Sequence, residues 1–275
     1  MNFVSDFENK ILETIKQHKL LTKKDKILVA YSGGKDSGTL LYILKKYGFN
    51  VEALYINLHI KNFSEFCYEA VKKFCEKYNV KLHVVDFRKE FGGSICFLHE
   101  SLSRKGVKLK KCTLCGILRR NVINSIARKH GFTKVATGHN LDDEAQTFLM
   151  NLFKGNIWLS SKLGPKVGVI QHKNFVPRVK PLYFCKEKEI EKYAKAINFP
   201  CYFAVCPCAA FAYRRFLINS LKRYNFNLEN VVSFFLEIMP LLRKNIKGKL
   251  YSCKICGEPS AKPICNFCQI IAKIK

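Results

Sequence analysis

The sequence predicts an α/β fold in which a parallel sheet carries helices on both faces. Short aliphatic runs alternate with amphipathic segments along most of the chain. The 275 residues are 48% hydrophobic, so they can bury a large core. Two glycine-containing loops, 32–37 and 137–144, each follow a predicted strand directly. Because ligands bind at the carboxyl ends of parallel strands, this edge is the expected site.

The apolar pattern gives the elements in chain order. Residues 3–20 place apolar side chains at helical spacing and predict a first helix. The expected strands are 27–31, 51–57, 81–86 and 133–137, and the further expected helices are 37–47, 63–78, 115–130, 142–154, 186–197, 209–224 and 228–244. The basic residues 87–111 are expected to form a long loop. Residues 155–184, rich in Gly, Pro and Lys, are expected to be a crossing segment.

These elements suggest four parts. They are an N-terminal helix (1–24), a nucleotide-binding catalytic domain (25–225), a helical connector (226–248) and a cysteine ribbon (249–275).

The net charge of +27 implies a polyanionic partner, and we favour nucleic acid over a membrane surface. No apolar stretch approaches the ~18 residues that span a bilayer. No signal peptide pattern is visible, so a cytoplasmic location is expected. In that setting, 13 cysteines favour metal or redox chemistry over disulfides.

The first loop predicts a nucleotide site. Its glycines, Gly33 and Gly34, allow a tight turn and close approach of a ligand. The helix that follows offers free N–H groups to an anion, and Lys35 adds a positive charge. The loop is not a Walker A motif. A nucleotide phosphate is therefore expected among the loop residues Ser32, Gly33, Gly34, Lys35, Asp36 and Ser37, and a glycine turn without a ligand is disfavoured.

The second loop reads Thr-Gly-His-Asn-Leu-Asp-Asp-Glu and opens a helix. Gly138 ends the strand, and His139 could contact a phosphate or be an ordinary polar residue. Asp142 and Glu144 fit the role of acidic caps at a helix start. The functional interpretation is a carboxylate that holds Mg²⁺ on the ATP phosphates or assists proton transfer.

Cysteines at the tail predict a zinc site. Two C-x-x-C pairs lie close together, and four thiolates suit tetrahedral Zn²⁺. A segment this short cannot fold on its own apolar area, so metal binding would supply the missing free energy. Zinc is favoured over a single iron, and the four expected ligands are Cys253, Cys256, Cys265 and Cys268.

A further C-x-x-C pair, Cys112 and Cys115, opens a predicted helix. It could be a redox dithiol, half of a zinc site, or part of an iron–sulfur site completed by a distant cysteine. The candidates for that distant ligand are Cys185, Cys201, Cys206 and Cys208. The remaining cysteines are expected to be core or loop residues without a role, namely Cys67, Cys75 and Cys96.

Three motifs occur in order: Ser-Gly-Gly-Lys-Asp-Ser at 32–37, Cys-Thr-Leu-Cys-Gly at 112–116, and the loop at 137–144. With them the chain resembles the tRNA 2-thiouridine synthetases of the TtcA and TtuA group. These are PP-loop ATP pyrophosphatases with a fold like that of the adenine nucleotide alpha hydrolases. The resemblance covers about residues 20–225, and the tail ribbon places it nearest the TtuA branch. That branch usually begins with another zinc-binding segment, whereas this chain has no cysteine before Cys67.

The resemblance implies that ATP adenylates the C2 oxygen of a uridine or cytidine in tRNA and that sulfur replaces it. It implies a [4Fe–4S] cluster on Cys112, Cys115 and Cys206, the last in a Cys-Pro motif. Asp143 matches the family's catalytic aspartate, and Arg119 matches a basic catalytic residue. Lys35 would stabilise the developing phosphate charge. The implied partners are tRNA, a sulfur donor (a ubiquitin-like thiocarboxylate carrier or sulfide) and a second copy in a homodimer.

Two other functions remain open on the residues alone. One is a cluster-free PP-loop ligase that modifies tRNA, such as a lysidine synthetase or an amidating enzyme. The other is a non-enzymatic protein that binds zinc and RNA.

Overall fold

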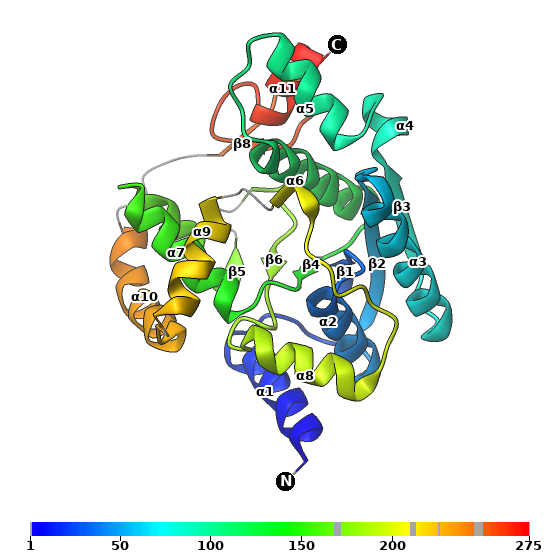
Figure 1. Cartoon of the computed structure of the whole chain (residues 1–275), viewed down its shortest axis with the longest axis vertical. Coiled ribbons are helices and arrows are strands. Elements are labelled where there is room, and N and C mark those ends of the chain that lie inside the picture. Colours follow the sequence, from blue (N-terminus) through cyan, green and yellow to red (C-terminus); the bar gives the residue numbers. More distant parts are fainter. Residues whose placement is uncertain (1, 168–171, 210–212, 225, 245–249, 275) are drawn as a thin grey trace.

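The computed structural model describes residues 2–167, 172–209, 213–224, 226–244 and 250–274. A six-stranded sheet with the order β3-β2-β1-β4-β6-β5 runs through the molecule (Figure 1). Neighbouring strands are parallel except for β5, which runs antiparallel to β6. The strands are β1 (Lys26–Ala30), β2 (Asn50–Asn57), β3 (Leu82–Asp86), β4 (Lys134–Thr137), β5 (Lys166–Val167) and β6 (Arg178–Val179). The predicted parallel sheet is confirmed.

Helices cover both faces of this sheet, as expected (Figure 1). The α-helices outside the tail are α1 (Phe3–Gln17), α2 (Lys35–Lys46), α3 (Lys61–Lys77), α4 (Phe87–Phe91), α5 (Ile95–Arg104), α6 (Lys111–Lys129), α7 (Leu141–Phe153), α8 (Glu187–Ile197), α9 (Tyr213–Arg223) and α10 (Leu228–Lys244). Two short 3₁₀ helices are η1 (Ile157–Lys162) and η2 (Pro207–Ala209). Helices α7, α9 and α10 gather beyond the β5 edge of the sheet (Figure 1).

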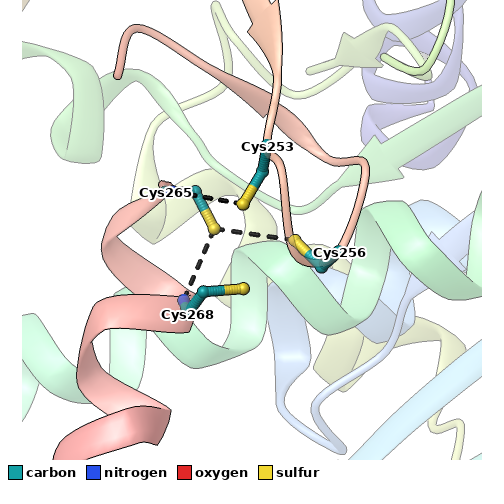
Figure 2. Close-up of side chains that lie close together, drawn as sticks. All are labelled: Cys253, Cys256, Cys265 and Cys268. Atoms are coloured by element: carbon teal, nitrogen blue, oxygen red, sulfur yellow. Dashed lines mark hydrogen bonds between the residues drawn. The ribbon is translucent and has the colours of Figure 1, made fainter. Parts of the chain in front are cut away.

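The tail forms a small ribbon of β7 (Tyr251–Ser252), β8 (Pro259–Ser260) and α11 (Asn266–Ile274). It gathers four cysteines at one point (Figure 2). The helix α11 packs on α5 and α6, and the Phe267 ring meets the Phe91 ring edge-on at 5.9 Å. The ribbon is therefore attached to the helices on one face of the sheet.

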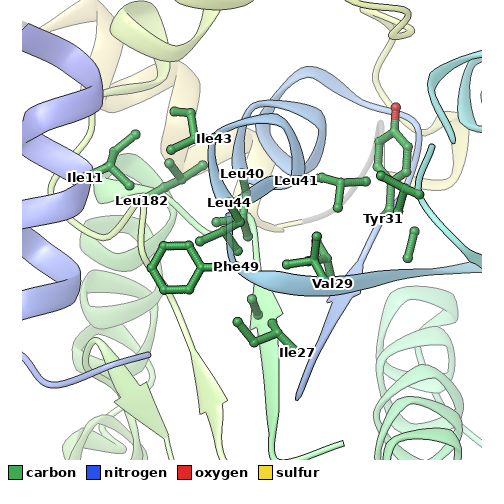
Figure 3. Close-up of a cluster of buried hydrophobic side chains, with 14 of the residues drawn as sticks. Ile11, Ile27, Val29, Tyr31, Leu40, Leu41, Ile43, Leu44, Phe49 and Leu182 are labelled. Atoms are coloured by element: carbon green, nitrogen blue, oxygen red, sulfur yellow. The ribbon is translucent and has the colours of Figure 1, made fainter. Parts of the chain in front are cut away.

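The strands are buried on both sides, so consecutive residues enter different cores. Ile27 and Val29 face the first core, which lies under α1, α2, α3 and α8 (Figure 3). Leu28 faces the second core, which lies under α5, α6 and α11. Sheets buried on both faces have such continuous apolar strands. Ile11 of α1 is fully buried in the first core.

Two expectations about irregular segments were wrong. Residues 87–111, predicted as one long loop, contain α4 and α5. Residues 155–184, predicted as a crossing segment, contain η1, β5 and β6, and β6 pairs with β4 in the main sheet. Residues 168–171 of that segment lie outside the described residues. The helix expected at 209–224 begins at Tyr213, and residues 210–212 also lie outside the description.

Across the part of the chain that the structure describes, no helix is both long and apolar enough to cross a membrane.

Candidate nucleotide and metal sites

The loop between β1 and α2 requires glycine at its first turn. Gly33 has a φ of +84°, and a side-chain carbon there would stand 2.6 Å from the Cys67 carbonyl oxygen. The backbone N–H of Tyr202 donates to the Gly33 carbonyl at 2.8 Å. Gly34 caps the start of α2, where free N–H groups face the loop. The loop is therefore held from both sides in a shape that suits an anion.

The side chains of this loop are tied to one another. The hydroxyl oxygens of Ser32 and Ser37 lie 3.0 Å apart, and the Ser32 N–H donates to the Ser37 hydroxyl at 3.2 Å. The Lys35 ammonium pairs with Asp36 at 3.1 Å and with Glu187 at 3.2 Å. Burial acts to lower the pKa of Lys35, but these two carboxylates raise it overall. A bound phosphate would thus compete with them for an ammonium that stays charged.

The loop after β4 lies directly against the first loop. A side-chain carbon on Gly138 would stand 2.7 Å from the backbone nitrogen of Ser37. The amide of Asn140 donates to the Asp36 carboxylate at 3.1 Å. Both loops follow neighbouring parallel strands, so the structure joins the two predicted loops into one surface.

The structure separates the three acids at the start of α7. The Asp142 carboxylate accepts from the Glu187 N–H at 2.8 Å and so caps α8. Glu144 is buried and forms a 2.6 Å ion pair with Lys180. Structural contacts therefore account for both residues, although neither makes the capping hydrogen bonds of α7, which come from Asn140 and Asp143. Asp143 alone of the three pairs with an arginine, Arg214 of α9, at 3.1 Å.

Asp143 also belongs to the cap of α7, because its N–H donates to the Asn140 side chain at 3.0 Å. Burial raises the pKa of its carboxyl, and the Arg214 guanidinium opposes that rise. Arg214 is fixed in turn by a 2.7 Å hydrogen bond to Thr147. His139 is exposed, and its Nδ1 lies 3.0 Å from the Thr137 hydroxyl oxygen. The site thus offers a carboxylate and a guanidinium beside the joined loops.

The thiols of Cys112, Cys115 and Cys206 come from two segments, the first turns of α6 and the residue before η2. Burial raises the pKa of the Cys115 thiol, Arg119 opposes the rise, and the neighbouring Cys206 and Cys112 add to it. The Cys112 thiol donates to the Cys208 carbonyl at 3.5 Å. The structure therefore brings both segments and Arg119 to one place.

The distant candidates can now be compared. Cys185 is fully buried in the first core, and Cys201 packs against the same core. Cys206 and Cys208 pack against the second core together with Cys115. Cys96, which the sequence analysis expected to be a core or loop residue without a role, has its sulfur 3.7 Å from that of Cys208. Helix α5 thus carries Cys96 to the same region.

The donor set fits an iron–sulfur cluster by its chemistry, because the Cys115 thiol has the Cys112 and Cys206 thiols and the Arg119 guanidinium as neighbours. Each thiolate of a four-iron cluster binds a different iron, so the sulfurs stand farther apart than around one ion. Among the described residues, the tight group of metal-binding side chains is the tail set instead.

The tail set fits a single tetrahedral ion. The sulfurs of Cys253, Cys256, Cys265 and Cys268 all lie within 4.8 Å of one another (Figure 2). Zinc–sulfur bonds of ~2.3 Å place the sulfurs about 3.8 Å apart. The Cys265 N–H donates to the Cys253 sulfur at 3.3 Å. Burial acts to raise the pKa of Cys253, but backbone N–H groups lower it to about 6, which favours the thiolate.

Sequence reasoning did not assign roles to three residues that complete the nucleotide site. Arg214 pairs with Asp143, Glu187 pairs with Lys35, and Asn140 links the two loops. Asn140 had a signal, since an Asn three residues before an acid is typical of a helix cap. The partners of Asp143 and Lys35 lie far along the chain, and no local pattern reveals them.

Comparison with known proteins agrees with this geometry. Residues 4–202 match the PP-loop domain family. The tRNA-5-methyluridine(54) 2-sulfurtransferase of Pyrococcus horikoshii is 38% identical over 273 residues, which cover 98% of this chain and 85% of the relative. The cytoplasmic tRNA 2-thiolation protein 1 of Caenorhabditis elegans is 30% identical over 285 residues and covers 98% and 73% of the two chains.

A solved structure is also similar along nearly the whole chain. The U34-tRNA thiolase NcsA of Methanococcus maripaludis, with its [4Fe–4S] cluster, superposes with a TM-score of 0.77 at 26% identity. The match covers 98% of this chain and 87% of that one. The fold and the joined loops define a PP-loop nucleotide-binding protein. Within that class, the chain belongs to the family of tRNA 2-sulfurtransferases.

Proposed function

We propose that this protein is an ATP-dependent tRNA sulfurtransferase that replaces the C2 oxygen of a uridine or cytidine with sulfur. The observation that carries the proposal is the contact between the loops of Gly138 and Ser37, with Asp143 and Arg214 beside it. It places a phosphate loop against a carboxylate and a guanidinium. A cluster-free ligase is disfavoured because the cysteine pair of α6 and Cys206 lie together near the second core.

The proposed reaction has two steps, adenylation of the pyrimidine oxygen and its replacement by sulfur. The phosphate loop, Ser32 to Ser37, would hold ATP, with Gly138 and His139 at its side. The pyrimidine oxygen attacks the α-phosphorus and pyrophosphate leaves; sulfide sulfur then bonds to C2 while AMP carries the oxygen away. Lys35, Arg119 and Arg214 would stabilise phosphate charge. Asp143 would hold Mg²⁺ on the phosphates or take a proton.

Two metal centres are assigned to the cysteines. Cys112, Cys115 and Cys206 would hold a [4Fe–4S] cluster, which supplies an iron that can bind an exogenous sulfur ligand. The four tail cysteines would hold Zn²⁺, which stabilises the ribbon.

The partners follow from charge and family. A protein of net charge +27 suits tRNA. The sulfur donor is proposed as a ubiquitin-like thiocarboxylate carrier or sulfide, and a homodimer is the proposed assembly. The cytoplasm is the proposed location, since relatives such as that of Caenorhabditis elegans are named cytoplasmic thiolation proteins.

The test is a thiolation reaction with anaerobically reconstituted protein, unmodified tRNA transcript, ATP, Mg²⁺ and sulfide. Mass spectrometry of the nucleosides should show a 2-thiopyrimidine, with AMP and pyrophosphate formed in equal amount. Asp143→Asn should slow the formation of all three products strongly, whereas Glu76→Gln, on an outer face of α3, should not change them. Formation of AMP and pyrophosphate without any thiolated nucleoside would instead support a cluster-free ligase.

A further inference from the structure

A pocket of about 430 Å³ lies between α6, β6 and the C-terminal ribbon. Its lining includes none of the residues of the joined loops, although Cys265 of the tail set lies at its edge. Four basic side chains line it, namely Arg120, Lys162, Arg178 and Lys262. They come from four different parts of the chain, so only the folded protein brings them together. A pocket with this lining is suited to an anion.

These basic side chains lack acidic partners. None of the four makes an ion pair within the described residues. The Nε–H of Arg178 is buried and finds no hydrogen-bond acceptor in the part of the chain that the structure describes. Burial, together with the like charge of Arg120 nearby, lowers the pKa of Arg178 to about 10. A buried donor between like charges costs free energy unless an anion meets it.

The acid among the lining residues is already engaged. Glu258 is buried, and its carboxylate pairs with Arg128 at 3.2 Å and accepts from the Asn124 amide. Asn124 also accepts from the Val176 N–H at 2.9 Å. These contacts fix the ribbon to α6 and to the segment before β6. The pocket is therefore rigidly built, and its carboxylate does not neutralise Arg120 or Arg178.

The pocket shares α6 with the thiol region. Arg119 lies beside the Cys115 thiol, and the next residue of the same helix, Arg120, lines the pocket. Arg178 lies on β6, the neighbour of β4, whose loop carries Gly138. An anion bound in this pocket would thus be held at a fixed position relative to the proposed reaction centre.

We propose that this pocket binds a backbone phosphate of the RNA substrate and positions the target nucleotide. The inference rests on the proposed function, because it takes the ligand to be tRNA. Guanidinium groups bind phosphate through paired hydrogen bonds, and two of them converge here. The Phe175 ring, 5.7 Å from the Arg178 guanidinium carbon, would hold that side chain in place.

The experiment measures tRNA binding by anisotropy across a range of salt concentrations for Arg120→Gln, Arg178→Gln and wild type. Each variant should bind roughly three- to tenfold more weakly, and the slope of log K against log salt should shrink by about 1. Lys16→Gln and Lys24→Gln, which are exposed and do not line the pocket, remove the same charge and should change neither value. The KM for tRNA should rise in the pocket variants, with kcat for saturating tRNA nearly kept.

The outcomes separate the two claims. Wild-type protein that neither binds nor thiolates tRNA would refute the proposed function and this inference with it. Wild-type activity with unchanged affinity and slope in both pocket variants would refute the pocket alone. Arg120 is exposed, so Arg120→Gln should leave the fold intact. Its tRNA affinity therefore tests the pocket even if Arg178→Gln lowers the stability of the protein. Inorganic phosphate should compete with tRNA in wild type at millimolar levels; competition that persists in Arg120→Gln would locate the phosphate elsewhere.

Discussion

Gly138 lies against Ser37 so closely that a side-chain carbon would stand 2.7 Å from the Ser37 backbone nitrogen. This contact joins two loops that are about a hundred residues apart in sequence but follow neighbouring strands. The Asn140–Asp36 hydrogen bond of 3.1 Å strengthens the same junction. The two loops therefore act as one surface, and a change in either should affect nucleotide binding.

Gly138→Ala should damage this junction. The new methyl group meets backbone atoms that cannot give way, so we expect a loss of about 1–3 kcal/mol of stability. Pyrophosphate release should fall with it. Thermal unfolding and a pyrophosphate assay measure the two effects. Gly34→Ala is the matched comparison, because its nearest contact would be 3.6 Å away. It should keep the wild-type melting temperature yet weaken ATP binding, and a normal ATP affinity for both variants would contradict the role of the loops.

Asp143 and Arg214 should act as a unit. Their ion pair is partly exposed, so we expect about 1 kcal/mol or less of stability from it. The effect on AMP formation should be larger, roughly a hundredfold for Asp143→Asn or Arg214→Gln. The double variant should be little worse than either single variant, because each loss already breaks the unit. If the rate loss in the double variant equals the product of the two single losses, Asp143 and Arg214 have independent roles.

The sequence allowed prediction of the sheet centre and of both loops, because these signals are local. Strands such as β1 are continuous aliphatic runs, and Gly33 and Gly138 stand where the chain turns. The two residues of β6 carry no such signal, since Arg178 and Val179 form neither an alternating nor an apolar run. Their place in the sheet comes from pairing with β4, which depends on the whole fold.

Helix α5 shows a different limit. Its basic neighbours made 87–111 look like a loop, although Ile95, Leu98 and Leu102 lie at helical spacing and are buried. The helical spacing was therefore visible in the sequence, but the many basic residues of the segment led to the prediction of a loop. The pairs Asp143–Arg214 and Cys96–Cys208 could not be predicted, because each joins residues brought together only by tertiary packing.

Stability should fall in acid because of Glu8. This buried carboxylate accepts from Lys46 at 2.7 Å, from Tyr47 at 2.7 Å and from Tyr193. Burial acts to raise the pKa of Glu8, but these donors lower it below its ordinary 4.5. The ionised form is therefore favoured by folding. Its contribution is complete above about pH 4.5 and is lost as the pH falls toward the lowered value.

Glu8→Gln tests this relationship. The variant should lose about 1–3 kcal/mol at pH 7 and should show a flatter loss of stability below pH 4.5 than wild type. Urea unfolding at several pH values from 3.5 to 7 measures both. Glu13→Gln, on an exposed position of the same helix, is the charge control. A wild-type acid response in Glu8→Gln would show that other carboxylates carry it.

The two proposed metal centres should be lost independently. Cys112→Ser and Cys206→Ala should remove iron from anaerobically reconstituted protein and keep about one zinc. Cys268→Ser should remove zinc and keep iron, while amide exchange in α11 becomes faster because the ribbon loses its metal ion.

Cys208→Ala tests which of the two cysteines near η2 is the third iron ligand, and it should keep iron if that ligand is Cys206. Iron kept in Cys206→Ala and lost in Cys208→Ala would move the assignment to Cys208. Iron absent from every preparation, with zinc present, would favour a cluster-free enzyme in which Cys112 and Cys115 serve redox or zinc chemistry.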